Sequence, residues 1–126
     1  MNWMQTMRAF AVSAVILIAS DASSVAAQDK PVPAAFAACK MCHKVAAGQP
    51  NGIGPNLWQI GGRRAGSAQF NYSAAMKAST IIWNKATLTA FTMDPRKTVP
   101  DNRMPYAGLK DPQAAAEIAA YLMAAK

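Results

Sequence analysis

Residues 39–43 read Cys-Lys-Met-Cys-His, a C-x-x-C-H pentapeptide. Cys39 and Cys42 are the only two cysteines of the chain, and His43 is its only histidine. Two thiols three residues apart lie near one face of a helical turn, where they can add to two vinyl groups on adjacent edges of a porphyrin. A histidine directly after the second thiol can then direct its ring at the iron. The pentapeptide therefore predicts covalent attachment of one c-type haem.

Two other uses of these residues are disfavoured. A structural zinc site needs four ligands, whereas this chain supplies only three cysteine or histidine side chains. A redox-active C-x-x-C pair is typical of a thioredoxin-like βαβ unit, and the chain has no such pattern. The histidine directly after Cys42 also favours haem attachment.

The first 27 residues resemble a secretory signal. Arg8 is followed by an apolar run over residues 9–19, and Val25 and Ala27 fit the −3 and −1 positions of a cleavage site. The run is too short for an ordinary membrane span of about 20 residues. We therefore predict a signal peptide over 1–27, cleavage after Ala27 and a periplasmic domain over 28–126. An uncleaved membrane anchor is the alternative.

The domain over 28–126 is basic, with twelve Lys or Arg against five Asp or Glu. A basic excess indicates nucleic acid, a membrane surface or an acidic protein as the partner. No nucleic-acid motif is present, and the aromatic residues are not interleaved with the basic ones. An acidic protein partner is the better interpretation. A core this small is marginal, so a buried haem is expected to supply much of the missing apolar contact.

The sequence patterns indicate an all-α fold of short helices and long loops. Alanine-rich residues 34–41 predict a helix that runs into the haem motif. Ser73 is expected to cap a helix that ends near residue 78, and residues 84–93 predict another that stops at Asp94-Pro95. Asp111 and Pro112 begin the last helix. Residues 98–108 are expected to form a loop, and no strand pattern or internal repeat appears.

A haem with one protein ligand binds or transforms small molecules, whereas one with two is usually an electron carrier. With no second histidine, methionine is the expected sixth ligand. Met41 lies inside the attachment motif, and Met93 and Met123 lie in predicted helices. Met104 lies in an irregular loop far from His43 in sequence, which favours it. Met76, in the short helix, is the weaker candidate.

From Phe36 to Leu122 the chain resembles the class I cytochromes c, close to the mitochondrial and bacterial c2-type members. The matching pieces, in the family's order and spacing, are residues 39–43, Gly54-Pro-Asn-Leu57, Gly62-Arg63, Tyr72, Trp83, Pro95-Arg-Lys97, residues 100–104 and Ala107-Gly108. The resemblance implies the small cytochrome c fold wrapped around one haem. It also implies that Met104 is the sixth ligand and that the carbonyl of Pro55 accepts the Nδ1 proton of His43.

The resemblance further implies hydrogen-bond donors for the buried haem propionates. Arg63, Tyr72 and Trp83 match such positions, and a buried carboxylate needs donors of this kind. Asn102 matches a position that is usually Thr and donates toward a propionate. Phe91 departs from the family, which often has Tyr beside the axial methionine.

These expectations together predict a monomeric, single-haem electron carrier with no enzymatic activity. Its partners would be acidic faces of larger redox proteins, with a reductase or dehydrogenase as donor and an oxidase or photosynthetic centre as acceptor. Basic residues near the Met104 loop and in the attachment motif are expected to ring the docking face: Arg96, Lys97, Arg103, Lys110 and Lys40. Two alternatives remain. One is a dedicated haem subunit of a periplasmic dehydrogenase, and the other is a peroxidase or gas-binding protein in which Met104 dissociates.

Overall fold

The computed structural model describes residues 30–126, so the predicted signal peptide lies outside the described part of the chain. The elements in chain order are η1 Ala34–Phe36, α1 Ala37–Lys40, α2 Ala74–Ala78, α3 Lys85–Met93, α4 Pro95–Thr98 and α5 Pro112–Ala124. Over 30–126 the only β pairing is an isolated bridge between Arg64 and Ile82. The all-α prediction is confirmed.

Side-chain caps begin the helices where the sequence predicted them. Ser73 accepts a hydrogen bond from the Met76 backbone N–H at the start of α2. Asn84 and Thr87 form a reciprocal capping box at the start of α3. Asp111 accepts from two backbone N–H groups at the start of α5, with a proline in its first turn. Each cap satisfies donors that have no partner inside their own helix, so these boundaries are determined locally.

Helix α4 was not predicted. Asp94-Pro95 was interpreted as a stop, and it does end α3 at Met93. The same residues also start a new helix, because the Asp94 carboxylate accepts from the Lys97 N–H and Pro95 occupies the first turn. Proline is tolerated there because its missing N–H has no helical partner in any case. The short α4 therefore lies between the predicted helix and the predicted loop over 98–108, and it overlaps that loop only at Thr98.

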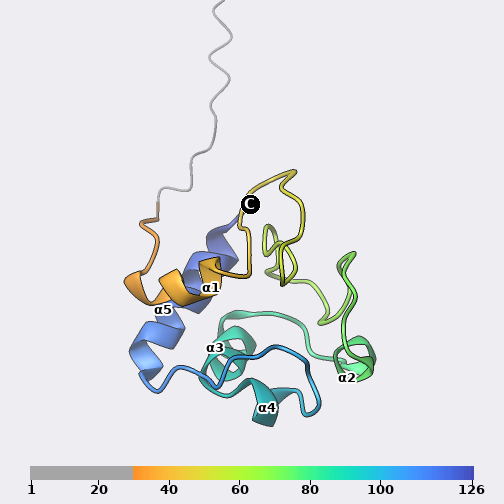
Figure 1. Cartoon of the computed structure of the whole chain (residues 1–126). Helices are drawn as coiled ribbons and strands as arrows, with labels where there is room; N and C mark the ends of the chain where they lie inside the picture. Colours follow the sequence, from red (N-terminus) through yellow and green to blue (C-terminus); the bar gives the residue numbers. More distant parts are fainter. Residues whose placement is uncertain (1–29) are drawn as a thin grey trace, which may run out of the picture.

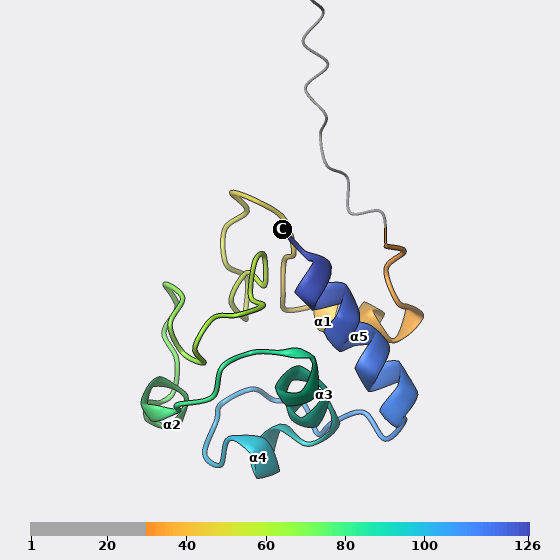
Figure 2. The same ribbon diagram turned by 180° about the vertical axis from the view of Figure 1, so that it is seen from behind.

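Helices near the two ends of the described chain cross at the core. Figures 1 and 2 show the η1–α1 segment and α5 on one side of the molecule, where η1 contacts α5, and α3 packs against both α5 and α4. At the crossing, the Phe36 and Tyr121 rings lie 5.2 Å apart between centroids. Phe36 and Ile118 are each only 1% exposed. Burying a side chain of this size contributes about 1.5–3 kcal/mol.

Long loops between α1 and α2 form the other side of the molecule (Figures 1 and 2). Backbone hydrogen bonds over long sequence distances hold them: Gln59 N–H donates to the Ala125 carbonyl at 2.9 Å, and Gly62 N–H to the Trp83 carbonyl at 2.7 Å. The loops are thereby attached to α5 and to the segment before α3. Across residues 30–126, no helix has the length and apolar character needed to cross a bilayer.

Candidate haem site

A cavity of about 620 Å³ lies between the helices and the loops. Most of its lining is apolar, from side chains such as Leu57, Ile60, Leu88, Phe91 and Leu122. Of the nine residues predicted for the site, eight line it: Cys39, Cys42, His43, Pro55, Tyr72, Trp83, Asn102 and Met104. Residues from four distant parts of the sequence therefore meet around one apolar space.

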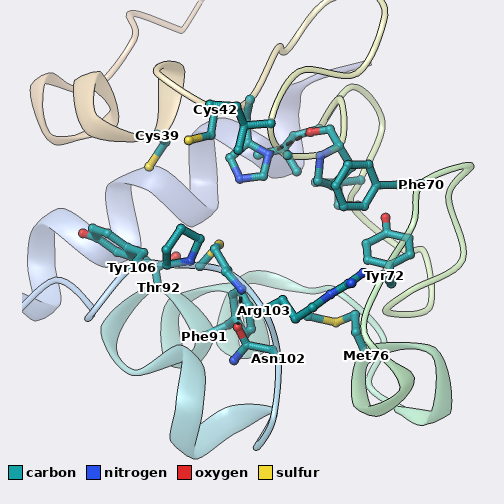
Figure 3. Close-up of a pocket in the computed structure, with 18 of the residues that line it drawn as sticks. Cys39, Cys42, Phe70, Tyr72, Met76, Phe91, Thr92, Asn102, Arg103 and Tyr106 are labelled. Carbon is teal, nitrogen blue, oxygen red and sulfur yellow. Dashed lines mark hydrogen bonds between the residues drawn. The ribbon is translucent and has the colours of Figure 1, made fainter.

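The attachment motif continues the turn of α1 beyond its last residue. The Cys42 and His43 backbone N–H groups both donate to the Cys39 carbonyl, at 3.1 and 2.9 Å. This turn brings the Cys39 and Cys42 sulfurs to the same wall of the cavity (Figure 3). Both cysteines are free thiols, and burial raises the pKa of the Cys39 thiol. Two thiols are thus available at one wall.

His43 is held in one orientation by the next loop. Its Nδ1 lies 2.7 Å from the Pro55 carbonyl oxygen, which can only accept, so Nδ1 carries the proton. Burial lowers the pKa of His43, although the Pro55 carbonyl opposes this effect. The ring is therefore neutral near pH 7, and the lone pair of Nε2 is free to bind a metal.

Gly54 is required beside this ring. A Cβ at Gly54 would lie 2.7 Å from Nδ1 and 2.9 Å from Nε2 of His43, closer than real Cβ atoms approach other atoms. The Gly54 N–H also donates to the Cys42 carbonyl at 2.9 Å, which joins this loop to the attachment motif. The glycine therefore lets the Pro55 carbonyl reach the imidazole.

The wall facing the cysteines carries the candidate methionines. Asn102 and Arg103 lie on that wall together with Met76, and Met104 lines the same cavity (Figure 3). Met93 and Met123 do not line it. Met41 does, but its side chain is 81% exposed beside the cysteines. Apart from the exposed Met41, the methionines that line the cavity are Met104 and Met76.

Trp83 and Tyr72 present hydrogen-bond donors to the cavity. Trp83 is 5% exposed and packs edge-on against Phe91, with centroids 5.1 Å apart. Among residues 30–126, no group accepts a hydrogen bond from the Trp83 indole N–H. Burial raises the pKa of Tyr72, while a hydrogen bond from the Ala68 backbone and the charge of Arg63 oppose that shift. Tyr72 lines the cavity, and its hydroxyl can donate a hydrogen bond there.

Two residues predicted as propionate donors are placed differently. Arg63 is exposed and does not line the cavity, although its charge acts on Tyr72. Asn102 lines the cavity, but its amide hydrogens donate to the Pro95 and Val99 carbonyls at 2.9 and 2.8 Å. Neither hydrogen remains for a carboxylate. No local pattern in the sequence indicates either arrangement.

Arg103 and Ile53 also line the cavity, which the sequence did not indicate. Arg103 is exposed, as expected for a residue of the surface ring, and its guanidinium also donates to the Asn71 carbonyl at the cavity wall. Ile53 is 74% exposed and, like Met41, belongs to both the lining and the surface. Met41 and Ile53 therefore mark the rim of the cavity.

The observed site fits haem c by its own chemistry. It combines an apolar cavity, two adjacent thiols, a neutral imidazole with a free Nε2 and a buried indole N–H without an acceptor. These features define a protein that binds one haem covalently.

The chain belongs to the cytochrome c family, whose family model, described as Cytochrome c, matches residues 31–126. It is similar to cytochrome c2 iso-2 of Magnetospirillum fulvum, with 45% identity over 71% of this chain and 94% of that protein. It is also similar to the cytochrome c of Ulva intestinalis, with 42% identity over 68% and 78%. Among solved structures, cytochrome cH from Methylobacterium extorquens matches with TM-score 0.65 and 39% identity, over 70% of this chain and 89% of that one.

Family membership makes this a single-haem protein similar to cytochromes c2, and Cys39, Cys42 and His43 fit one covalent haem c. The resemblance inferred from the sequence, the predicted cofactor and the assignment to electron transport are confirmed.

Proposed function

We propose that this protein is an electron carrier whose iron ligands are His43 and Met104. The observation that carries the proposal is the His43–Pro55 hydrogen bond, which fixes a neutral imidazole at one wall of a cavity that Met104 also lines. Haem c, when bound, supplies the Fe(II)/Fe(III) couple. Histidine and methionine ligands are typical of cytochromes that transfer electrons.

The protein's own residues keep that couple isolated. Cys39 and Cys42 attach the group, and His43 stays oriented through Pro55. The apolar lining, including Leu57, Leu88 and Phe91, excludes water. Tyr72 and Trp83 offer the donors that carboxylates at the cavity need. Arg63 acts there through its charge on Tyr72. A preorganised, dry site changes little between two oxidation states, which favours simple electron transfer.

We assign the docking face to the rim at Met41 and Ile53. Both side chains are strongly exposed and line the cavity, so they lie where a partner comes nearest to the bound group. Lys40, next to Met41 in the chain, and Arg103, which also lines the cavity, are exposed basic residues of the predicted ring. A partner with an acidic face would therefore be attracted to this side. The chain acts in the periplasm if the predicted signal over 1–27 is cleaved.

The alternatives differ in what they need from Met104. A peroxidase or gas-binding protein needs an open iron position and a distal acid–base group. The chain has no second histidine for that role. A dedicated dehydrogenase subunit would keep Met104 bound but form one long-lived complex. Co-purification at low salt distinguishes this case from a carrier that serves two partners.

Replacing Met104 tests the ligand assignment. Met104→Ala should abolish the methionine–iron charge-transfer band of the ferric protein and open the iron to cyanide. Met76→Ala, which removes the other cavity methionine, should retain the band. Loss of the band in Met76→Ala instead would assign the ligand to α2. Rapid cyanide binding by the unmodified protein would favour the gas-binding or peroxidase alternative.

A further inference from the structure

Both polar atoms of the Asn102 side chain form hydrogen bonds, with α4 and with the loop that follows it. It is 7% exposed and is the only buried polar or charged residue among 30–126. Its two amide hydrogens donate to the Pro95 and Val99 carbonyls, at 2.9 and 2.8 Å. Its Oδ1 accepts from the Met104 N–H at 3.0 Å. Two carbonyls on one side and an N–H on the other leave only one orientation of the amide that satisfies all three.

We propose that Asn102 is the residue that positions Met104, and that it acts through the backbone rather than on the bound group. The proposal rests on the proposed function, in which Met104 is the iron ligand, and gives Asn102 a role there. Asn102 connects Pro95, the first residue of α4, directly to the backbone of the proposed ligand.

A loop needs such a support because it has no ladder of backbone hydrogen bonds. Methionine is flexible, and its neutral thioether is a weak ligand, so the position of its backbone has to be determined by the protein. Helix α4 provides the fixed point: Pro95 is buried, and the Asp94 cap holds the start of the helix. Asn102 donates to the Pro95 carbonyl in α4, which also accepts from the Val99 N–H, and to the carbonyl of Val99, the residue directly after the helix.

The backbone at Asp101 directs Asn102 toward α4. Asp101 has φ +62°, in the left-handed region that Asp adopts more readily than most residues. The chain therefore reverses immediately before Asn102, and the Asn102 N–H also donates to the Val99 carbonyl at 3.3 Å. The side chain and the backbone of Asn102 thus bind the same turn of α4.

Asn56 provides a matched comparison on the histidine side. Its Nδ2 donates to the Ala46 and Gln49 carbonyls at 2.7 and 2.9 Å, and its Oδ1 accepts from the Trp58 N–H at 3.0 Å. Asn102 and Asn56 thus form the same set of bonds. The amide nitrogen donates to two carbonyls earlier in the chain, and the amide oxygen accepts from the N–H two residues later. Asn56 directly follows Pro55, which holds His43. Asn56 does not line the cavity, and of the two asparagines only Asn102 is bonded to Met104.

The test measures access of cyanide to the iron of the ferric holoprotein, together with the methionine–iron charge-transfer band. Asn102→Ala removes all three hydrogen bonds and should raise the cyanide association rate about tenfold, or about 1.4 kcal/mol, while weakening the band. Asn102→Thr keeps one donor and one acceptor, so its rate should be intermediate. Asn56→Ala and Asn56→Thr should leave the rate within about twofold.

A loss of overall stability is expected for variants of either asparagine, so it does not distinguish their roles. The cyanide association rate distinguishes them, because only Asn102 is bonded to Met104. Equal rates in Asn102→Ala and Asn56→Ala would overturn the proposal. So would an Asn102→Thr protein that folds, binds haem and reacts with cyanide at the unmodified rate. Should Asn102→Ala fail to fold, the Thr pair decides the question by the same comparison. Retention of the band in Met104→Ala is a different result, since it would refute the ligand assignment itself.

Discussion

Gly54→Ala should damage the histidine side of the site through a steric contact. The added methyl group would lie 2.7 Å from Nδ1 of His43. The ring or the Pro55 loop must then move, and the Nδ1–Pro55 hydrogen bond is lengthened. Overpacking typically costs about 1–3 kcal/mol. Loss of one hydrogen bond costs about 0.5–1.5 kcal/mol. We therefore expect the free energy of unfolding to fall by about 2–4 kcal/mol.

Guanidinium unfolding of the ferric holoprotein measures this loss. The reduction potential provides a second measurement. A weaker Nδ1–Pro55 hydrogen bond makes the His43 imidazole donate less electron density to the iron, so ferric iron is stabilised less. The potential of Gly54→Ala should rise. Gly48→Ala is the control, since nothing lies within 4 Å of its added Cβ and only its φ of +70° is unfavourable. It should lose some stability but keep its potential. Equal stability and equal potential in the two variants would refute the steric argument.

Phe91→Tyr adds a hydroxyl to the cavity that Met104 also lines, and a hydrogen bond of about 0.5–1.5 kcal/mol from that hydroxyl to the Met104 sulfur would compete with iron. The pH at which Met104 is replaced on ferric iron should fall modestly, and an unchanged or higher value would show that the hydroxyl does not compete. Electron transfer to an acidic partner should slow as salt rises, because the Debye length shrinks from about 10 Å at 0.1 M to about 3 Å at 1 M. Lys40→Glu, next to the rim, should slow it more than Lys126→Glu, and equal effects would mean that only net charge matters. The exported protein should have the mass of the chain after Ala27 plus one haem that resists acid–organic extraction; freely extracted haem or an uncleaved chain would contradict this.

Features that depend only on residues close together in the chain were predicted correctly from the sequence. The pentapeptide at 39–43 identifies the cofactor because covalent attachment needs those residues at that spacing. Ser73, Asn84 and Asp111 cap helices by bonding N–H groups two or three residues away, so their effect is independent of the rest of the fold. Helix α4 was missed because Asp94-Pro95 both ends α3 and begins α4.

The partners of polar side chains depend instead on chain segments that meet only after folding. The sequence suggested Asn102 as a propionate donor, but α4 brings the Pro95 and Val99 carbonyls to its amide and uses both hydrogens. Arg63 was expected at the cavity, whereas Arg103 lines it and bonds Asn71, 32 residues earlier in the chain. The sequence by itself determined which cofactor this chain holds and where its helices begin, since those depend on local chemistry. Which side chains face the cofactor and which support its ligands was decided by the tertiary structure, because a hydrogen bond forms with whichever group the fold brings within reach.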